Sequence, residues 1–124
     1  MTIRVSDPAY SKTSDIPGEL YVLPLKDSVI FPAMVLPIFL TREDDIEVVN
    51  KALLGDHMVA MVAQKDPSVE TPSPDNLYNF GTATRIIQMV KLQEGGVKIL
   101  VEGINRIKIV EYFREGTHLK AKVE

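Results

Sequence analysis

The stretch LPLKDSVIFPAMVLPIF (residues 23–39) decides the fold, because three prolines, Pro24, Pro32 and Pro37, interrupt an apolar run. Val, Ile and Phe favour strands. Proline has no amide hydrogen for a central ladder and is confined to edge strands, strand starts and bulges. We therefore expect Pro24 and Pro37 at edges or corners of a sheet, and Pro32 between two short strands. The pattern indicates a curved, barrel-like sheet.

The same stretch carries more apolar side chains than one inward face of a short edge strand can bury. These side chains belong to Phe31, Met34, Val35, Ile38 and Phe39. The ordinary interpretation places all of them in the core, where such residues are usually found. The alternative leaves some of them in solvent, where methionine and phenylalanine form an adaptable surface for varied apolar partners. The sequence leaves both interpretations open.

Outward from this stretch, apolar residues alternate with polar ones or form short runs, which is typical of strands. The expected strands cover residues 20–25, 34–40, 58–64, 81–92, 97–102, 107–113 and 119–123. Glycines in EGG (94–96) and REG (114–116) supply the positive φ that tight hairpin connections need. The last strands are therefore expected to form antiparallel hairpins in a mainly β domain.

The segment TREDDIEVVNKALLGD (residues 41–56) predicts the one long helix. Thr41 is the expected N-cap, and Gly55 follows the expected end. Three acids complement the helix dipole in the first turn: Glu43, Asp44 and Asp45. A narrow apolar stripe is expected to cover one side of the sheet, and its members are Ile46, Val49 and Leu53.

Both ends of the chain and one internal segment differ in composition from the strands. Residues 1–18 are mostly polar and predict a flexible leader before a domain that covers residues 19–124. Residues 65–76 hold three prolines and predict a mobile surface loop. The final HLKAKVE (residues 118–124) stops within an alternating strand. We therefore expect the chain to be a fragment of a longer protein.

Composition narrows the class of protein. The chain has 124 residues, 45% of them hydrophobic, which fits one domain with its own core. The formal net charge of −3 disfavours nucleic acid as the main partner. The chain has no cysteine, so it forms neither disulfides nor thiolate metal sites, and we expect it in the cytoplasm. No run approaches the about 18 apolar residues of a membrane span.

Motifs for catalysis or cofactor binding are absent from the sequence. It contains neither the phosphate-binding G-x-x-x-x-G-K-[ST] nor the nucleophile elbow G-x-S-x-G. The two histidines, His57 and His118, have no neighbour at the spacing of metal ligands. We expect no catalytic residue, no metal site and no cofactor in this chain.

A dispersed set of short motifs carries a family resemblance. The set comprises Leu23-Pro24-Leu25 with Asp27, Phe31-Pro32, Pro37, Arg42, VAQK (residues 62–65), Gly81-Thr82, Val101-Glu102-Gly103 and Arg106. Over residues 19–124 the sequence resembles the amino-terminal domain of the ATP-dependent protease Lon. It departs from that pattern at Lys26, where arginine is common, and at Thr41, where glycine is common. These departures concern local loop shape.

The resemblance implies an α+β, mainly β fold: a PUA-like six-stranded pseudobarrel with one α-helix. It also implies a non-catalytic domain that recognises unfolded or degron-bearing polypeptides and organises a homo-oligomeric, commonly hexameric, ring. In that family the full chain is an AAA+ serine protease that uses ATP and Mg to degrade misfolded and regulatory proteins. Its ATPase and protease domains would lie outside these 124 residues.

Two groups of residues are candidate substrate contacts. The first is the apolar segment, with Phe31, Pro32, Met34, Val35 and Phe39. The second is the start of the helix, with Arg42, Glu43 and Asp44, although the helix dipole already accounts for these acids.

Two other functions stay open. The apolar segment could join protomers of a ring in a purely architectural module. A PUA-like fold could also bind RNA through a basic strip of Arg106, Lys108, Arg114, Lys120 and Lys122. Outward-facing lysines, however, commonly serve to keep strand edges from aggregating.

Overall fold

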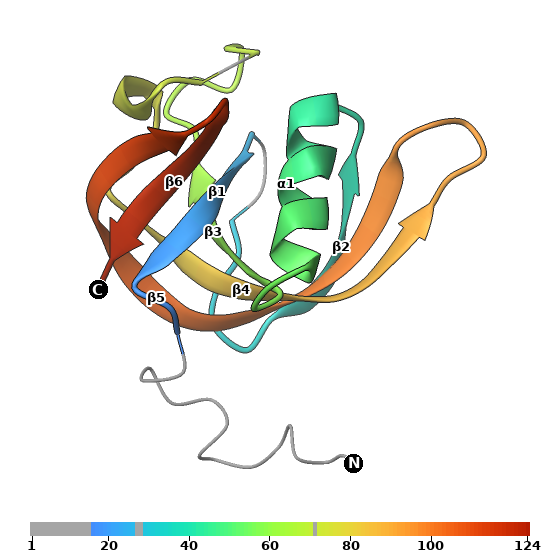
Figure 1. Ribbon diagram of the computed structural model, residues 1–124, viewed down its shortest axis with the longest axis horizontal. Helices are drawn as coiled ribbons and strands as arrows, with labels where there is room; N and C mark the ends of the chain where they lie inside the picture. Colours follow the sequence, from blue (N-terminus) through green and yellow to red (C-terminus); the bar gives the residue numbers. More distant parts are fainter. Residues whose placement is uncertain (1–15, 27–28, 71) are drawn as a thin grey trace.

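The computed structural model describes residues 16–26, 29–70 and 72–124, and within them it has six strands and one α-helix (Figure 1). The elements are β1 (Glu19–Leu25), β2 (Val35–Leu40), α1 (Glu43–Leu53), β3 (Met58–Ala63), the short 3-10 helix η4 (Pro74–Asn76), β4 (Phe80–Lys91), β5 (Val97–Glu115) and β6 (His118–Val123). The predicted mainly β fold with one helix is confirmed.

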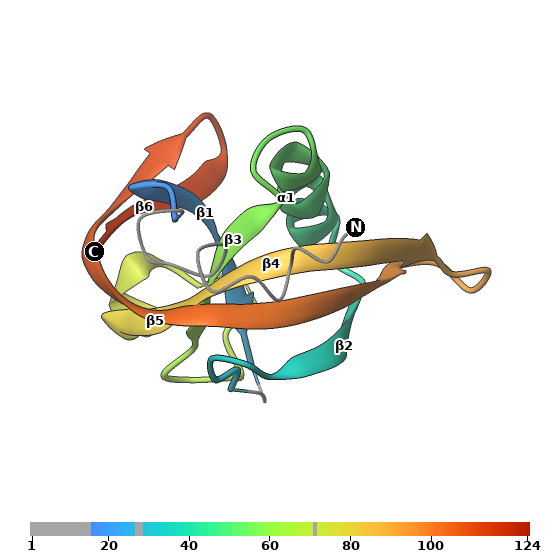
Figure 2. The ribbon, with the colours of Figure 1, turned by 90° about the horizontal axis from the view of Figure 1, so that it is seen from below.

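The strands form one sheet that closes on itself. Its order is β2-β5-β4-β3-β1-β6, and β5 also pairs with β6. Only β1 and β3 are parallel among these pairs; the others are antiparallel. The strands β1, β3, β4, β5 and β6 therefore make a closed barrel, and β2 extends it along the first half of β5 (Figure 2).

The three prolines of residues 23–39 lie where their missing amide hydrogen is tolerated. Pro37 is on β2, whose only partner in the sheet is β5. Pro24 lies on β1 beyond the part of that strand, Glu19–Tyr21, that pairs with β6. Pro32 lies in a turn between β1 and β2. The expectation of edges and corners is confirmed at all three positions.

The expectation of separate strands over 97–102 and 107–113 is wrong, because β5 runs without interruption through 19 residues. Its residues 97–102 pair with β2, and residues 97–108 pair with β4 along the other edge. Its last part, residues 109–115, pairs with β6. Gly103 lies in the gap between the two expected strands. In the structure it is a point of close approach, since a Cβ built there would overlap the carbonyl oxygen of Phe31.

Two clusters of buried side chains form the core. The first lies under α1 and includes Leu23, Val49 and Ile99. The second fills the barrel and includes Val22 and Ile107. Neighbouring residues of β1 face different clusters because successive side chains of a strand point to opposite faces. The strand β5 contributes to both clusters.

The predicted leader, residues 1–18, lies mostly outside the described residues. Its last residues are placed: Ile16 packs against the cluster inside the barrel. The amide of Val123 on β6 donates a hydrogen bond of 2.9 Å to the carbonyl of Gly18. Residues 16 and 18 therefore contact the barrel, and the boundary of the flexible leader stays a prediction.

The helix differs from expectation at its start and on its buried face. Its N-cap is Arg42, not Thr41, and no side chain caps it. The expected stripe is wider, because Val48 and Ala52 are buried beside Val49. The three first-turn acids are present, so the dipole rather than a capping hydroxyl stabilises this end. No helix in the described part of the chain is long and apolar enough to cross a membrane.

Candidate functional site

The surplus of apolar side chains in residues 31–39 is divided between two faces of β2. Leu36, Ile38 and Leu40 face the first core cluster. The alternate residues Val35 and Phe39 point away from it and are 55% and 63% exposed. A strand turns successive side chains to opposite faces, so one short strand serves both the core and the surface.

A tight turn holds the preceding apolar residues at the surface. The amide of Met34 donates to the carbonyl of Phe31 at 3.1 Å, with Pro32 and Ala33 at the centre of the turn. Ala33 has φ of 74°, the positive value that the third residue of a type II turn adopts. Two hydrogen bonds with Gly103, from the amide of Ala33 (2.8 Å) and to the carbonyl of Met34 (2.9 Å), fasten the turn to β5.

All five predicted apolar contacts are exposed, with Phe31 at 52% and Met34 at 36%. We call them the apolar edge: Phe31, Pro32, Met34, Val35 and Phe39. The structure therefore supports the interpretation that part of this apolar segment faces solvent. Their role as substrate contacts stays a prediction.

A pocket of about 300 Å³ adjoins the apolar edge at Phe31. We call it the Phe31 pocket, and its lining includes Val29, Phe31, Tyr78, Phe80, Thr82 and Arg106. Val29, Tyr78 and Phe80 are each about half exposed. Sequence reasoning missed all three. The only signal was the spacing of two aromatic residues in LYNF directly after the proline-rich loop.

A second groove, of about 390 Å³, joins the two predicted sites. Its lining includes Phe39 of the apolar edge and Arg42 at the helix start, together with Lys26, Asp45 and Gln64. We call it the Arg42 groove. Sequence reasoning did not select Lys26, Asp45 or Gln64, because only the fold brings them to the end of β2.

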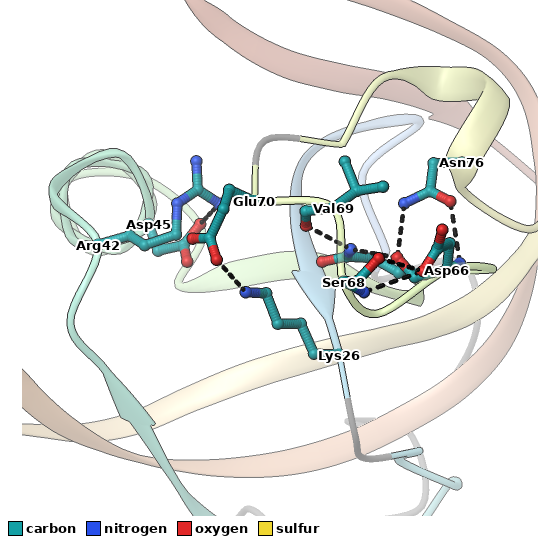
Figure 3. A network of polar contacts seen from close by, with 9 residues as sticks. Lys26, Arg42, Asp45, Asp66, Ser68, Val69, Glu70 and Asn76 are labelled. Carbon is teal, nitrogen blue, oxygen red and sulfur yellow. Dashed lines mark hydrogen bonds and ion pairs between the residues drawn. The ribbon is translucent and has the colours of Figure 1, made fainter.

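The charged residues of the Arg42 groove already have ionic partners, some of them outside its lining. The Arg42 guanidinium lies 3.4 Å from the Asp44 carboxylate. It also lies 3.6 Å from the carboxylate of Asp45 (Figure 3). Burial raises the pKa of the Asp45 carboxyl, and the charge of Arg42 opposes that shift. On the other side, the ammonium group of Lys26 lies 3.6 Å from the carboxylate of Glu70. An anionic ligand in this groove would have to displace these carboxylates from Arg42 and Lys26.

Hydrogen bonds fasten the loop of residues 65–76 beside the Arg42 groove (Figure 3). The side-chain amide of Gln64 donates to the carbonyls of Asp66 (3.2 Å) and Val69 (3.0 Å). The Ser68 hydroxyl and amide donate to the Asp66 carboxylate and hold its pKa below the usual value. The amide of Asp66 in turn donates to Asn76 at 2.9 Å. The described part of this loop is thus hydrogen-bonded to Gln64 and within itself, and its mobility stays a prediction.

The predicted basic strip is largely paired within its own hairpin. Lys120 lies 3.2 Å from Glu115, and Lys122 lies 3.7 Å from Glu111. The guanidinium of Arg114 donates to a turn carbonyl at 3.3 Å. Three members form no ion pair among the described residues: Arg114, which has only that hydrogen bond, and Arg106 and Lys108. The strip therefore does not form a continuous surface of unpaired cations.

Within residues 16–26, 29–70 and 72–124, no three side chains of His, Asp or Glu gather as metal ligands would. His118 is buried and lies 3.3 Å from the carboxylate of Glu47, and it contacts the ring of Tyr21 edge-on. His57 is exposed in the turn after α1 with φ of 65°. Neither histidine therefore belongs to a cluster of metal ligands among the described residues. The expectation that the chain lacks metal and cofactor sites stays a prediction.

The sequence of this chain matches a protein-family model and several known proteins. The model of the ATP-dependent protease La (LON) substrate-binding domain matches residues 19–124. Lon protease of Dictyoglomus thermophilum is 37% identical over 114 residues, which cover 92% of this chain and 14% of that protein. Lon protease of Escherichia coli K12 is 42% identical over 106 residues, covering 86% and 14%. The chain thus spans about a seventh of these relatives.

Solved structures share the fold. The N-terminal domain of Mycobacterium avium complex Lon protease aligns with a TM-score of 0.69 and 21% identity, over 86% of this chain and 53% of that one. A Lon N-terminal domain protein from Xanthomonas campestris aligns with a TM-score of 0.67 and 15% identity, over 86% and 58%. The predicted pseudobarrel is confirmed by these likenesses, and with the family match the chain belongs to the family of Lon protease substrate-binding domains.

Proposed function

We propose that this chain binds unfolded or degron-bearing polypeptides on the apolar edge and delivers them to a Lon-type ATP-dependent protease. The observation that carries this proposal is the exposure of five apolar side chains in one short segment, beside the Phe31 pocket. Exposed apolar surface of this kind marks interaction sites in soluble proteins. Unfolded polypeptides expose the apolar side chains that such a surface would bury.

The backbone of the apolar edge is held in place before any partner arrives. The turn is bonded to Gly103, and β2 is paired with β5 over six residues. Binding to a preorganised surface loses less conformational entropy than binding to a flexible one. Met34 adds an adaptable side chain, which suits partners of varied sequence.

We propose Arg42, Glu43 and Asp44 as a second contact. Glu43 and Asp44 are exposed, and Arg42 shares a groove with Phe39. A polypeptide that leaves the apolar edge at Phe39 would therefore meet these charges next. Basic side chains of the polypeptide would pair with the two acids.

The remaining expectations concern the longer protein. We propose that it is a homo-oligomeric, commonly hexameric AAA+ ring that binds ATP and Mg and hydrolyses misfolded and regulatory proteins in the cytoplasm. None of these steps is assigned to a residue of this chain. The chain's part would be to recognise the substrate and to help organise the ring.

An NMR titration of the 124-residue chain with an unfolded, apolar-rich polypeptide tests the proposal. We expect the amide shifts to concentrate on residues 31–39, and Phe31→Ser with Met34→Ser to abolish them in a chain that stays folded. Leu54→Ser is the matched control, because Leu54 is 89% exposed but lies at the end of α1, outside the apolar edge. Binding that survives the double variant would show the assignment to be wrong.

A second candidate function is supported by the open side of β2, which pairs with β5 alone in the sheet. A strand with one free edge can pair with another chain, so the apolar edge would then join protomers. Association that depends on chain concentration, and that the double variant abolishes, would favour this function. RNA binding is the weaker alternative because most of the basic strip is paired. Absence of RNA binding at low salt would exclude it.

A further inference from the structure

We propose that the Phe31 pocket binds the C-terminal residue of a polypeptide, with an apolar side chain inside the pocket and the terminal carboxylate held by Arg106. This inference rests on the proposed function and adds to it the chemical identity of one substrate feature. Beyond the apolar edge it involves Tyr78, Phe80 and Arg106, which lie 47 to 75 positions after Phe31 in the sequence.

The pocket has the size and lining for one apolar side chain. Its volume is about 300 Å³, at the lower end of the range for small-ligand sites. The rings of Tyr78 and Phe80 face the pocket together with Phe31, each about half exposed. The aliphatic side chains of Leu25, Val29 and Ile30 complete the wall. An aromatic or large aliphatic side chain would bury apolar surface on several sides.

Arg106 brings a positive charge to the border of this apolar pocket. It is opposite Thr82 in the register of β4 and β5, so both side chains lie on the same face of the sheet. Lys108 follows on that face, opposite Phe80. Both cations are exposed, and among the described residues neither forms an ion pair. Glu124 shares a neighbouring pocket with Arg106 without pairing with it.

A ligand that matches this site combines an apolar group with a nearby anion. The C-terminal residue of a polypeptide has that combination, with the side chain and the carboxylate on one carbon atom. An internal residue has only the apolar side chain. Arg106 would form charged hydrogen bonds to the carboxylate, which are stronger than neutral ones.

The pocket is less suited to a nucleobase, the other ligand that aromatic rings and cations can hold. A base buried there would need partners for the polar atoms on its edge. The Thr82 hydroxyl on the pocket lining already donates to the carbonyl of Ile30 at 2.5 Å. The rest of the wall is mostly aliphatic or aromatic. The observations therefore favour a polypeptide.

Two peptides of one sequence that end in phenylalanine, one with a free carboxylate and one amidated, test the inference by fluorescence anisotropy with the 124-residue chain. We expect amidation to weaken binding about tenfold to a hundredfold, as for the loss of a charged hydrogen bond. Arg106→Gln should weaken the free-acid peptide to the level of the amidated one and leave the latter unchanged. Lys91→Gln removes the same charge from an exposed position elsewhere on β4 and should have no effect.

The possible failures are distinguishable. Equal binding of both peptides, weakened by Phe31→Ser but not by Arg106→Gln, would overturn the carboxylate assignment and leave the proposed function standing. Absence of binding by either peptide, together with no response to an unfolded polypeptide, would overturn both. Tighter binding of a single-stranded oligonucleotide, lost in Arg106→Gln, would replace the polypeptide by nucleic acid.

Discussion

Replacing Gly103 by alanine tests how the apolar edge is held. An added Cβ would overlap the carbonyl oxygen of Phe31 and lie 3.0 Å from its carbonyl carbon. The obstacle is backbone, so the turn of residues 31–34 must move away from β5. Its movement would break the two hydrogen bonds that Gly103 makes with Ala33 and Met34.

The magnitude follows from these contacts. Overpacking typically destabilises by about 1–3 kcal/mol, and each hydrogen bond contributes about 0.5–1.5 kcal/mol net. Alanine also lowers the conformational entropy of the unfolded chain, which stabilises the folded state by about 0.4–1 kcal/mol. We therefore expect Gly103→Ala to lower the free energy of unfolding by about 3 kcal/mol, within a range of about 1–6 kcal/mol.

Urea unfolding followed by circular dichroism measures this loss. Gly55→Ala is the control, because a Cβ added at Gly55 would lie 3.9 Å from the carbonyl oxygen of Ala52, an ordinary contact. We expect that variant to stay within about 0.5 kcal/mol of the parent. If Gly103→Ala were no less stable than Gly55→Ala, the turn would not be fastened to β5 as described.

Two further substitutions probe the same region and the barrel. Ala33→Gly should raise the melting temperature, with a gain of up to about 1 kcal/mol, because Ala33 has a positive φ that glycine adopts without strain; a lower melting temperature would contradict this. Tyr112→Phe removes the 2.6 Å hydrogen bond from the phenol to the carbonyl of Tyr78 and should cost about 1 kcal/mol at neutral pH. Burial raises the pKa of Tyr112 to about 12 from its ordinary 10.0, so its contribution is complete below pH 10 and is lost as pH rises towards 12. Urea titrations across that range should therefore show a steeper loss in the parent than in Tyr112→Phe, and equal slopes would refute the assignment.

Local rules predicted much of the fold. Proline chemistry placed Pro24, Pro32 and Pro37 correctly, and alternation located the strands to within a few residues. The rules failed where a distant contact decides the local structure. The role of Gly103 in the middle of β5 could not be predicted, because the turn that it accommodates is about 70 residues away in sequence. Arg42 is the N-cap instead of Thr41, and the first-turn acids complement the helix dipole at this end without a capping hydroxyl.

The same local rules predicted one part of the candidate site, the apolar edge, and missed the other, the Phe31 pocket. Composition identified the apolar edge, since its surplus of apolar residues is a property of one contiguous segment. The Phe31 pocket could not be predicted, because Tyr78 and Phe80 reach Phe31 only through the pairing of β4 with the rest of the barrel. The ion pairs of Lys120 and Lys122 in the basic strip likewise depend on the register of β5 and β6.

The length of β5 has a mechanical consequence. Ile99 and Ile107, on either side of Gly103, belong to different core clusters, and the turn is bonded at Gly103 between them. A force on a polypeptide held at the apolar edge would enter β5 near its middle and be shared by both clusters. We therefore expect the domain to resist traction as one body, with a single rupture event in a single-molecule pulling experiment. Early detachment of β2 as a separate event would show that the load does not reach the barrel.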